Sequence, residues 1–147
     1  MRRVLFVALI VVLVLTGCGG STAIPTVPDP PKSTVFEQGD NQQINQFVDG
    51  LKTQVPAEMK KHGVKDTAEQ PIVQQVYQST ASLQEIADFY KALTQEGWVE
   101  AQKMPGIQDG VLITGYDHGN TTLVVNAVDA SKLGGSGVVI YTVKGTK

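Results

Sequence analysis

The sequence predicts an α+β domain, in which an antiparallel β-sheet of about five strands ends in a C-terminal meander and carries one or two packed helices. Three observations support this prediction. Apolar residues at helical spacing occupy residues 41–62, a helix-capping signature opens a second helical stretch at residue 82, and short β-branched runs separated by turn residues fill the chain from residue 98 onward. The short connections between those runs favour antiparallel neighbours.

The first helical stretch has one apolar face. Its apolar residues recur at positions i, i+3, i+4, i+7 and i+11, namely Ile44, Phe47, Val48, Leu51 and Val55. Asp40 or Asn41 is the expected N-cap, because either side chain can accept a hydrogen bond from the first free backbone N–H groups. Pro56 lacks a backbone N–H, so we expect it to break or kink the helix and a second short helix to follow over residues 56–62.

The middle of the chain predicts a strand followed by a helix. Residues 72–78 are short and β-branched, and Ser82-Leu83-Gln84-Glu85 fits a capping box at the start of the next helix. Gly97 is expected to end that helix in the left-handed conformation. The helix is long enough for a right-handed crossover, which makes strand 72–78 and the strand beginning near Trp98 candidates for parallel neighbours.

Four further strands are expected in the last third of the chain, at residues 98–104, 111–116, 121–128 and 138–143. The last of them are apolar on both faces, which predicts that they lie centrally and that helices cover at least one side of the sheet. The stretch Gly134-Gly135-Ser136-Gly137 lies between two strands and is interpreted as a flexible hairpin loop. A phosphate-binding loop would need a lysine and a hydroxyl residue opening a helix.

The N-terminus predicts an export signal over residues 1–17. Arg2 and Arg3 precede an uncharged apolar run, the layout of a secretory signal peptide. The run is roughly a dozen strongly apolar residues, whereas a membrane-spanning helix needs about 20. A cleaved signal is therefore expected, not a permanent span.

The end of that run resembles the bacterial lipobox, on the residues Leu15-Thr16-Gly17-Cys18. The resemblance implies cleavage before Cys18 and attachment of diacylglycerol to its sulfur, so that membrane lipid is the first expected partner. A chance or buried cysteine is the alternative. Since one acyl chain anchors a protein only marginally, the two or three chains of a lipoprotein make attachment effectively permanent. The implied location is a bacterial membrane, on the extracytoplasmic side (cell surface or periplasm), with inner or outer membrane left open.

The lipobox interpretation determines how the chain is divided into segments. Residues 18–35 are expected to form the lipidated cysteine and a proline-rich tether, and residues 36–147 a single α+β domain. Because proline favours extended polyproline II, the tether could hold the domain up to about 50 Å from the membrane. Cys18 is the only cysteine, so no disulfide is expected and packing alone must stabilise the domain.

Composition and charge exclude several partners. After removal of residues 1–17 the chain has ten lysines, no arginine and fourteen acidic residues, a formal net charge of −4. An acidic domain without arginine is poorly suited to phosphate or nucleic acid, so no nucleic-acid partner is expected. The two histidines, His62 and His118, lie far apart in the sequence, which predicts no metal site and no cofactor.

Catalytic constellations are not apparent. In Asp117-His118 adjacent strand residues point to opposite faces, and Gly119-Asn120 predicts that His118 is a solvated turn residue. No spacing selects a pair among the acidic residues, and no nucleophile elbow is present. The chain is therefore expected not to be an enzyme, and no ligand-binding residue can be named from sequence. Lys60-Lys61-His62 with Lys65 is interpreted either as a membrane-facing basic cluster or as a solvated helix end.

The block from Tyr77 to the C-terminus resembles a domain of small uncharacterised bacterial lipoproteins. The resemblance rests on the helix Ser82–Tyr90, the Gly97-Trp98 pair and the β-meander that follows. It implies the fold and the address, and it brings no catalytic residues. Three functions are weighed: a lipid-anchored, non-catalytic module that binds an envelope protein, peptide or polymer; a cell-envelope hydrolase; and a structural or assembly subunit of an envelope complex.

Overall fold

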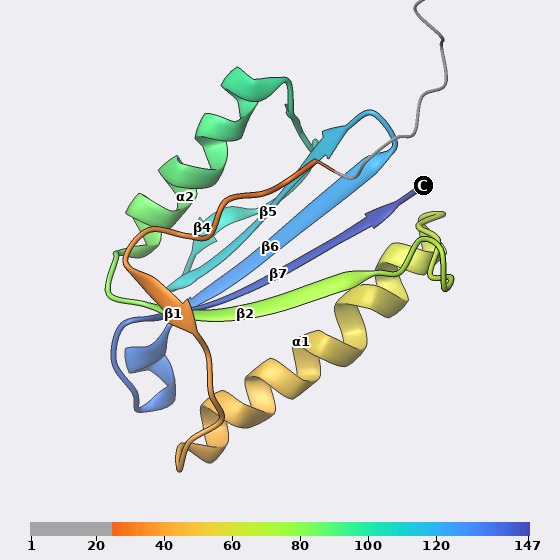
Figure 1. Ribbon diagram of the computed structural model, residues 1–147. Coiled ribbons are helices and arrows are strands. Elements are labelled where there is room, and N and C mark those ends of the chain that lie inside the picture. Colours follow the sequence, from red (N-terminus) through yellow and green to blue (C-terminus); the bar gives the residue numbers. More distant parts are fainter. Residues whose placement is uncertain (1–24) are drawn as a thin grey trace, which may run out of the picture.

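The computed structural model describes residues 25–147, which form one antiparallel β-sheet with two α-helices on it (Figure 1). The predicted α+β class and the C-terminal meander are confirmed. The elements are β1 (Ser33–Val35), α1 (Gln42–Lys61), β2 (Val73–Ser79), α2 (Leu83–Lys91), η1 (Ala92–Glu96), β3 (Val99–Glu100), β4 (Gly106–Gln108), β5 (Val111–His118), β6 (Thr121–Asp129), η2 (Ala130–Leu133) and β7 (Val138–Thr146). Predicted signal residues 1–17 and Cys18 lie outside the described residues.

The sheet order is β1-β2-β7-β6-β5-β3, and β4 also pairs with β5. The long strands β5, β6 and β7 form the centre, and their registers place Asn126 opposite both Ile113 and Tyr141. The expected parallel pairing of strand 72–78 with the strand near Trp98 is wrong. β2 pairs antiparallel with β1 and β7, while β3 pairs with β5. Three strands, β7, β6 and β5, lie between β2 and β3 in the sheet, and the connection from β2 to β3 contains α2. Within the predicted strand 98–104 only β3 is a strand, and β4 follows beyond it as a second short strand paired with β5.

Helix α1 covers one half of one sheet face. Its buried residues Ile44, Val48 and Met59 pack on apolar residues of β2 and β7. Asn41 is the N-cap, accepting hydrogen bonds from the backbone N–H groups of Gln43 and Ile44. The expected break at Pro56 is wrong, because α1 continues through it to Lys61 and no separate helix begins there. Proline removes one helical hydrogen bond, and packing of the apolar face on both sides of buried Pro56 holds the helix together.

Helix α2 covers the opposite face, over β5 and β6 (Figure 1). The predicted capping box is confirmed: Ser82 Oγ accepts from the Glu85 N–H at 3.2 Å, and the Glu85 carboxylate accepts from the Ser82 N–H at 2.8 Å. Gly97 ends the helical segment with a φ of 90°, as expected from sequence. Trp98, buried after this turn, joins the core beneath α2.

The stretch before β1 is part of the domain, and the name strap is used here for Pro25–Lys32. Ser79 Oγ donates to the Pro31 carbonyl at 2.7 Å, and Tyr77 Oη donates to Asp29 at 2.7 Å. Val27 packs against the core beneath α2. The predicted tether 18–35 is therefore wrong over residues 25–35, and the domain includes the chain from Pro25 onward and does not begin at residue 36. Extended, proline-rich chain still suits this position, because it lies across the sheet without needing helical hydrogen bonds.

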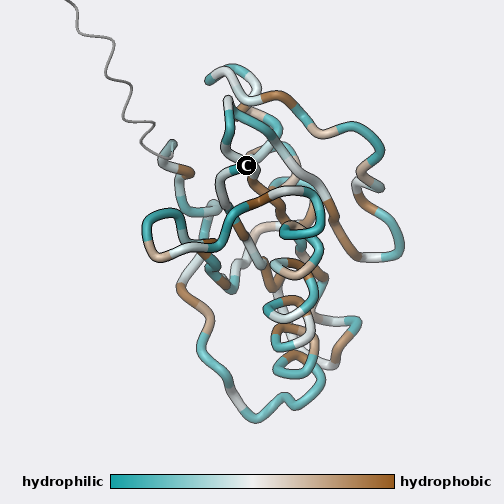
Figure 2. The backbone as a smooth tube through the Cα atoms, turned by 90° about the vertical axis from the view of Figure 1, so that its right-hand side faces the viewer, coloured by the Kyte–Doolittle hydropathy of each residue, from teal (hydrophilic) through white to brown (hydrophobic). Residues whose placement is uncertain are grey.

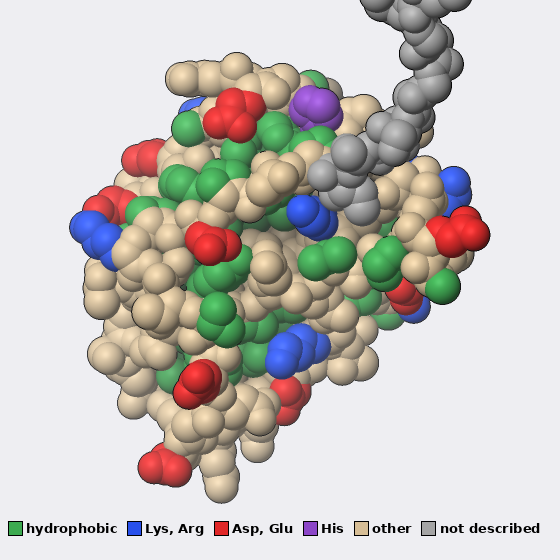
Figure 3. All heavy atoms as spheres, in the orientation of Figure 1, with side chains coloured by type: hydrophobic (Ala, Val, Ile, Leu, Met, Phe, Trp, Pro, Cys, Tyr) green, Lys and Arg blue, Asp and Glu red, His purple; other side chains and the backbone are tan. Residues whose placement is uncertain are grey.

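Each face of the sheet has two halves, one over β2 and β7 and the other over β5 and β6. The two helices and the strap cover three of these four half-faces. The strap lies on the β2 and β7 half of the face that α2 shares, while α1 covers β2 and β7 from the other side. Polar and apolar residues alternate along the turns of the helix that faces the viewer in Figure 2. In Figure 3 side chains of both charge signs are scattered over the visible face. The fourth half-face, over β5 and β6 beside α1, is open.

No helix within residues 25–147 is both long and apolar enough to cross a membrane.

Candidate functional site

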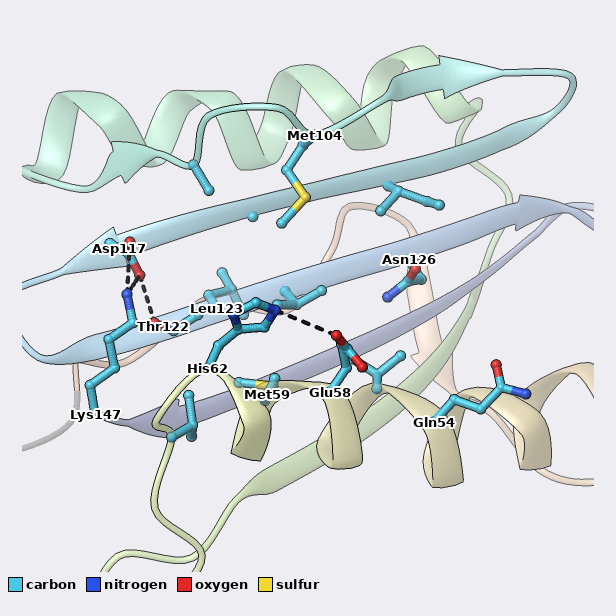
Figure 4. Close-up of a pocket in the computed structure, with 16 residues that line it drawn as sticks. Gln54, Glu58, Met59, His62, Met104, Asp117, Thr122, Leu123, Asn126 and Lys147 are labelled. Carbon is cyan, nitrogen blue, oxygen red and sulfur yellow. Dashed lines mark hydrogen bonds and ion pairs between the residues drawn. The ribbon is translucent and has the colours of Figure 1, made fainter.

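The open half-face forms a groove of about 670 Å³ between α1 and the β3–β4 connection (Figure 4). Its floor is the surface of β5 and β6, one wall is the C-terminal half of α1, and the other wall is the chain around Met104. This volume lies within the range of small-molecule and peptide-side-chain sites, about 300–1,000 Å³. The lining residues are Gln54, Val55, Glu58, Met59, His62, Val64, Ala101, Met104, Ile113, Gly115, Asp117, Thr122, Leu123, Val124, Asn126 and Lys147.

Gly115 allows the second wall to approach the floor. A Cβ at this position would lie 2.9 Å from the terminal methyl of Met104, closer than real Cβ contacts, and 3.2 Å from the Leu123 carbonyl oxygen, closer than most. Met104 therefore rests over Gly115, and Met59 lines the facing wall (Figure 4). Methionine side chains are unbranched and polarizable, so both walls can adjust to the shape of an occupant.

Asn126 lies in the floor of the groove with its polar group unsatisfied. The residue is 6% exposed, and its Nδ2 has no hydrogen-bond partner among the described residues. A buried donor without a partner is destabilising by about 1–3 kcal/mol, so such groups are rare unless they have a role. Figure 4 shows this amide at one end of the groove, with Gln54 on the α1 wall at the same end. The groove is thus apolar with an amide that a ligand could satisfy.

The α1 wall carries a charged pair. Glu58 lies 3.4 Å from His62 Nε2 and accepts a 2.8 Å hydrogen bond from Lys61 Nζ. The hydrogen bond and charge of Lys61 lower the pKa of Glu58, with a smaller contribution from His62. Glu58 and His62 are both exposed, so these contacts orient the side chains without isolating them from water.

The opposite end of the groove is closed by Asp117. Its Oδ1 accepts from Thr122 Oγ1 at 2.6 Å and from Lys147 Nζ at 3.0 Å, and Oδ2 lies 3.1 Å from the same ammonium (Figure 4). Both oxygens of the carboxylate are therefore engaged. The groove thus has an amide at one end, an ion pair at the other, and apolar surface between.

The two predicted histidines are not brought together. His62 lines the groove, whereas His118 lies on the opposite face with its ring 5.4 Å from that of Trp98. The opposite orientations of Asp117 and His118 are confirmed, but His118 is half-buried at the end of β5 and not a freely solvated turn residue. Within residues 25–147 no three His, Cys, Asp or Glu side chains cluster closely enough to hold a metal ion.

Apart from His62, the remaining predicted features fall outside the groove. Leu15, Thr16, Gly17 and Cys18 precede the described residues. The basic cluster lies at the end of α1, where Lys60 pairs with Asp66. The loop around Gly134 joins η2 to β7, as the hairpin interpretation requires.

Sequence reasoning named no ligand-binding residue and so missed the groove. One signal was available: Asn126 is the only polar residue in the run from Leu123 to Val128. An amide inside an otherwise apolar strand must either find a partner in the core or face a site. The contributions of Gln54 and Met104 depend on how the faces meet, and no sequence pattern marks them.

The lining of the groove offers an apolar surface and hydrogen-bonding groups, which suit recognition by shape and hydrogen bonding. Its apolar floor can take aliphatic or aromatic groups, and the Asn126 amide can pair with a carbonyl or another amide. Comparison of the chain with protein-family models, curated proteins and solved structures found no match. The resemblance to small bacterial lipoproteins stays a prediction from sequence.

Proposed function

We propose that this chain is a membrane-anchored extracytoplasmic lipoprotein whose domain is a non-catalytic binding module. The observation that carries the binding part is the open half-face with the unpartnered Asn126 amide in its floor. A core residue with no ligand to meet would be replaced by an apolar one without loss, since satisfied or absent polar groups are the stable alternatives. The anchor part is supported by Leu15-Thr16-Gly17-Cys18 at the end of the apolar run.

The expected ligand is an envelope protein, peptide or polymer with apolar groups and amides. The strap supports an extended chain as the occupant, because it covers the half-face behind β2 and β7 with one apolar side chain, Val27, and hydrogen bonds to Tyr77 and Ser79. The groove offers the same combination of apolar surface and hydrogen-bonding groups on the other face. Proteins reuse this mode, extended chain on apolar surface, in peptide recognition.

The binding proposal is tested by photo-crosslinking in intact cells. A photoreactive residue at Gln54, on the groove wall, is expected to give a discrete adduct with an envelope component. The same residue at Ala57, exposed on α1 but outside the groove lining, is the matched control and is expected to give none. Equal labelling from both positions, or none from Gln54, would contradict the proposal.

The anchor is tested separately by feeding labelled palmitate to cells that make the wild-type chain or Cys18→Ala. The wild type is expected to take up label and the variant to lose it. A wild type without label would show that Cys18 is not acylated.

A docking subunit is the second candidate, because both sheet edges expose apolar side chains. Val35 on β1 is 74% exposed and Val99 on β3 is 68% exposed. Edge strands of this kind can add a strand from a partner. Lysine at both positions would block such pairing while leaving the groove intact. If the docking function were correct, Val35→Lys with Val99→Lys would abolish capture of the partner, and Gln54→Trp would not.

A further inference from the structure

The strap fixes the point at which the chain before Pro25 joins the domain. Its first described residue, Pro25, accepts a hydrogen bond through its carbonyl from Lys144 Nζ at 3.3 Å, near the end of β7. From there to β1 the chain is held by Tyr77, Ser79 and the N–H of Thr80, which donates to the Lys32 carbonyl. The domain is therefore attached to whatever precedes it at one defined end of the sheet.

The chain between the anchor and this point is short. Seven residues, 18–24, separate the lipid-bearing end from Pro25, and even fully extended they span at most about 25 Å. From Lys144, which holds Pro25, back to Val138 at the start of β7 the strand rises about 20 Å, and the loop of residues 134–136 lies beyond that point. Turning the domain over, with the loop of residues 134–136 toward the bilayer, would need these seven residues nearly fully extended. The opposite orientation, with the Lys144 end of the sheet toward the bilayer, needs no such extension. The seven residues then keep their conformational entropy.

We propose, on the basis of the proposed lipid anchor, that the domain faces the bilayer with the sheet end that carries the β5–β6 turn, Lys144 and Lys147. The exposed turn Gly119-Asn120 and the exposed side chain of Val99, paired with Asp117 at the end of β5, lie at this end. The ion-paired end of the groove is here too, because Asp117 and Lys147 line it. The groove thus meets its ligand close to the membrane surface.

The short length of residues 18–24 sets this orientation, and attraction between charges on the protein and the membrane does not. The basic residues at this end of the molecule are Lys60, Lys61, Lys65, Lys144 and Lys147. Three of them pair with carboxylates: Lys60 with Asp66, Lys61 with Glu58, and Lys147 with Asp117. Glu69 lies in the same loop as Lys65, so the excess of positive charge is small. The orientation is therefore expected in neutral as well as anionic membranes.

The test places a donor dye at either end of the full lipidated protein. Cys18 is the only cysteine, and acylation blocks its sulfur, so a cysteine introduced at exposed Asn120 or exposed Ser136 can be labelled alone. Each variant is purified with its own anchor and reconstituted into vesicles of neutral phospholipid that contain an acceptor-labelled headgroup. The expected result is a greater loss of donor fluorescence at position 120 than at position 136.

Lengthening the anchor segment provides the control. A second copy of the sequence Gly-Gly-Ser-Thr-Ala-Ile inserted before Pro25 is expected to reduce or abolish the difference between the two positions, because the longer segment reaches both orientations. Equal loss at both positions in the unmodified protein, or a greater loss at position 136, would overturn the orientation alone. Protein that fails to remain with the vesicles and carries a reactive thiol at Cys18 would overturn the anchor as well.

Discussion

Asn126 is a buried amide that the fold itself does not satisfy. Its strand neighbours Val125 and Ala127 are fully buried on the opposite face, so the strand is fixed and the amide cannot turn away from the groove. Because its amide has no partner within the fold, the folded chain is expected to be more stable with an apolar residue at position 126. The proposed role in ligand binding gives a physical reason to keep a polar group at this position.

Replacing Asn126 with leucine is expected to increase the free energy of unfolding by about 1 kcal/mol, because the unsatisfied donor is removed and apolar contact is gained. Denaturant unfolding of wild type and Asn126→Leu measures the difference. Gln54→Leu removes an exposed amide of the same groove and should change stability by less than about 0.5 kcal/mol. A clear loss of stability in Asn126→Leu would show that the amide is satisfied in the folded chain.

Glu85 predicts a pH dependence that begins at the start of α2. Hydrogen bonds from the Ser82 backbone N–H and from Lys32, with a further contribution from the Ser82 hydroxyl, lower its pKa from 4.5 to about 2. A carboxylate with a lowered pKa in the folded state stabilises the fold above its unfolded pKa, and this contribution is lost as the pH falls through the folded pKa. The stabilisation is therefore complete above about pH 4.5 and disappears toward pH 2.

Thermal unfolding of wild type and Glu85→Gln across this range tests the prediction. The difference between their midpoints is expected to be constant from pH 7 to about pH 5 and to shrink toward pH 2. Glu69→Gln, which removes a carboxylate from an exposed loop, is the control for the change in net charge. A difference that does not change with pH would mean that Glu85 is not held by these partners.

At the scale of elements, the strap is the addition that sequence patterning did not reveal. Ser79 is 2% exposed and joins the strap to the sheet, because its hydroxyl donates to the Pro31 carbonyl and accepts from the Ala81 N–H. Ser79→Ala leaves a buried N–H and a carbonyl without this partner. We expect it to lower the free energy of unfolding by about 1–3 kcal/mol.

The measurement is denaturant unfolding, with Thr94→Ala as the control. Thr94 makes an exposed hydroxyl contact to the Lys91 carbonyl, so its loss should have a much smaller effect. If Ser79→Ala changed stability no more than Thr94→Ala, the strap would not be part of the cooperative fold.

Local sequence signals predicted the helices well, but they predicted poorly which strands pair across the sheet. The capping box at Ser82 and the left-handed Gly97 involve residues within a few positions of each other, so their chemistry is complete in the sequence. The break expected at Pro56 failed because packing of α1 on the sheet outweighs the loss of one hydrogen bond. The parallel pairing failed because strand neighbours are chosen by the whole sheet, which places β7 between β2 and β6.

At the scale of the whole molecule, the groove exists because the helices and the strap leave one part of the sheet surface uncovered. The helices and the strap cover three of the four half-faces, and the fourth is open. Which half-face stays open depends on the lengths and directions of elements far apart in sequence. The polar residue in the apolar run of β6 could be seen in advance, whereas the walls formed by Met59 and Met104 could not.

The proposed binding function requires the groove to be occupied when the chain is in place on the cell. It is tested most directly by the rate at which a cysteine at half-buried Ala101, in the groove lining, reacts with a small thiol reagent. Slower reaction is expected in intact cells than in the purified protein, while a cysteine at exposed Ala57 is expected to react at the same rate in both. Equal rates for Ala101→Cys in cells and in purified protein would show that the groove is empty and contradict the proposed binding function.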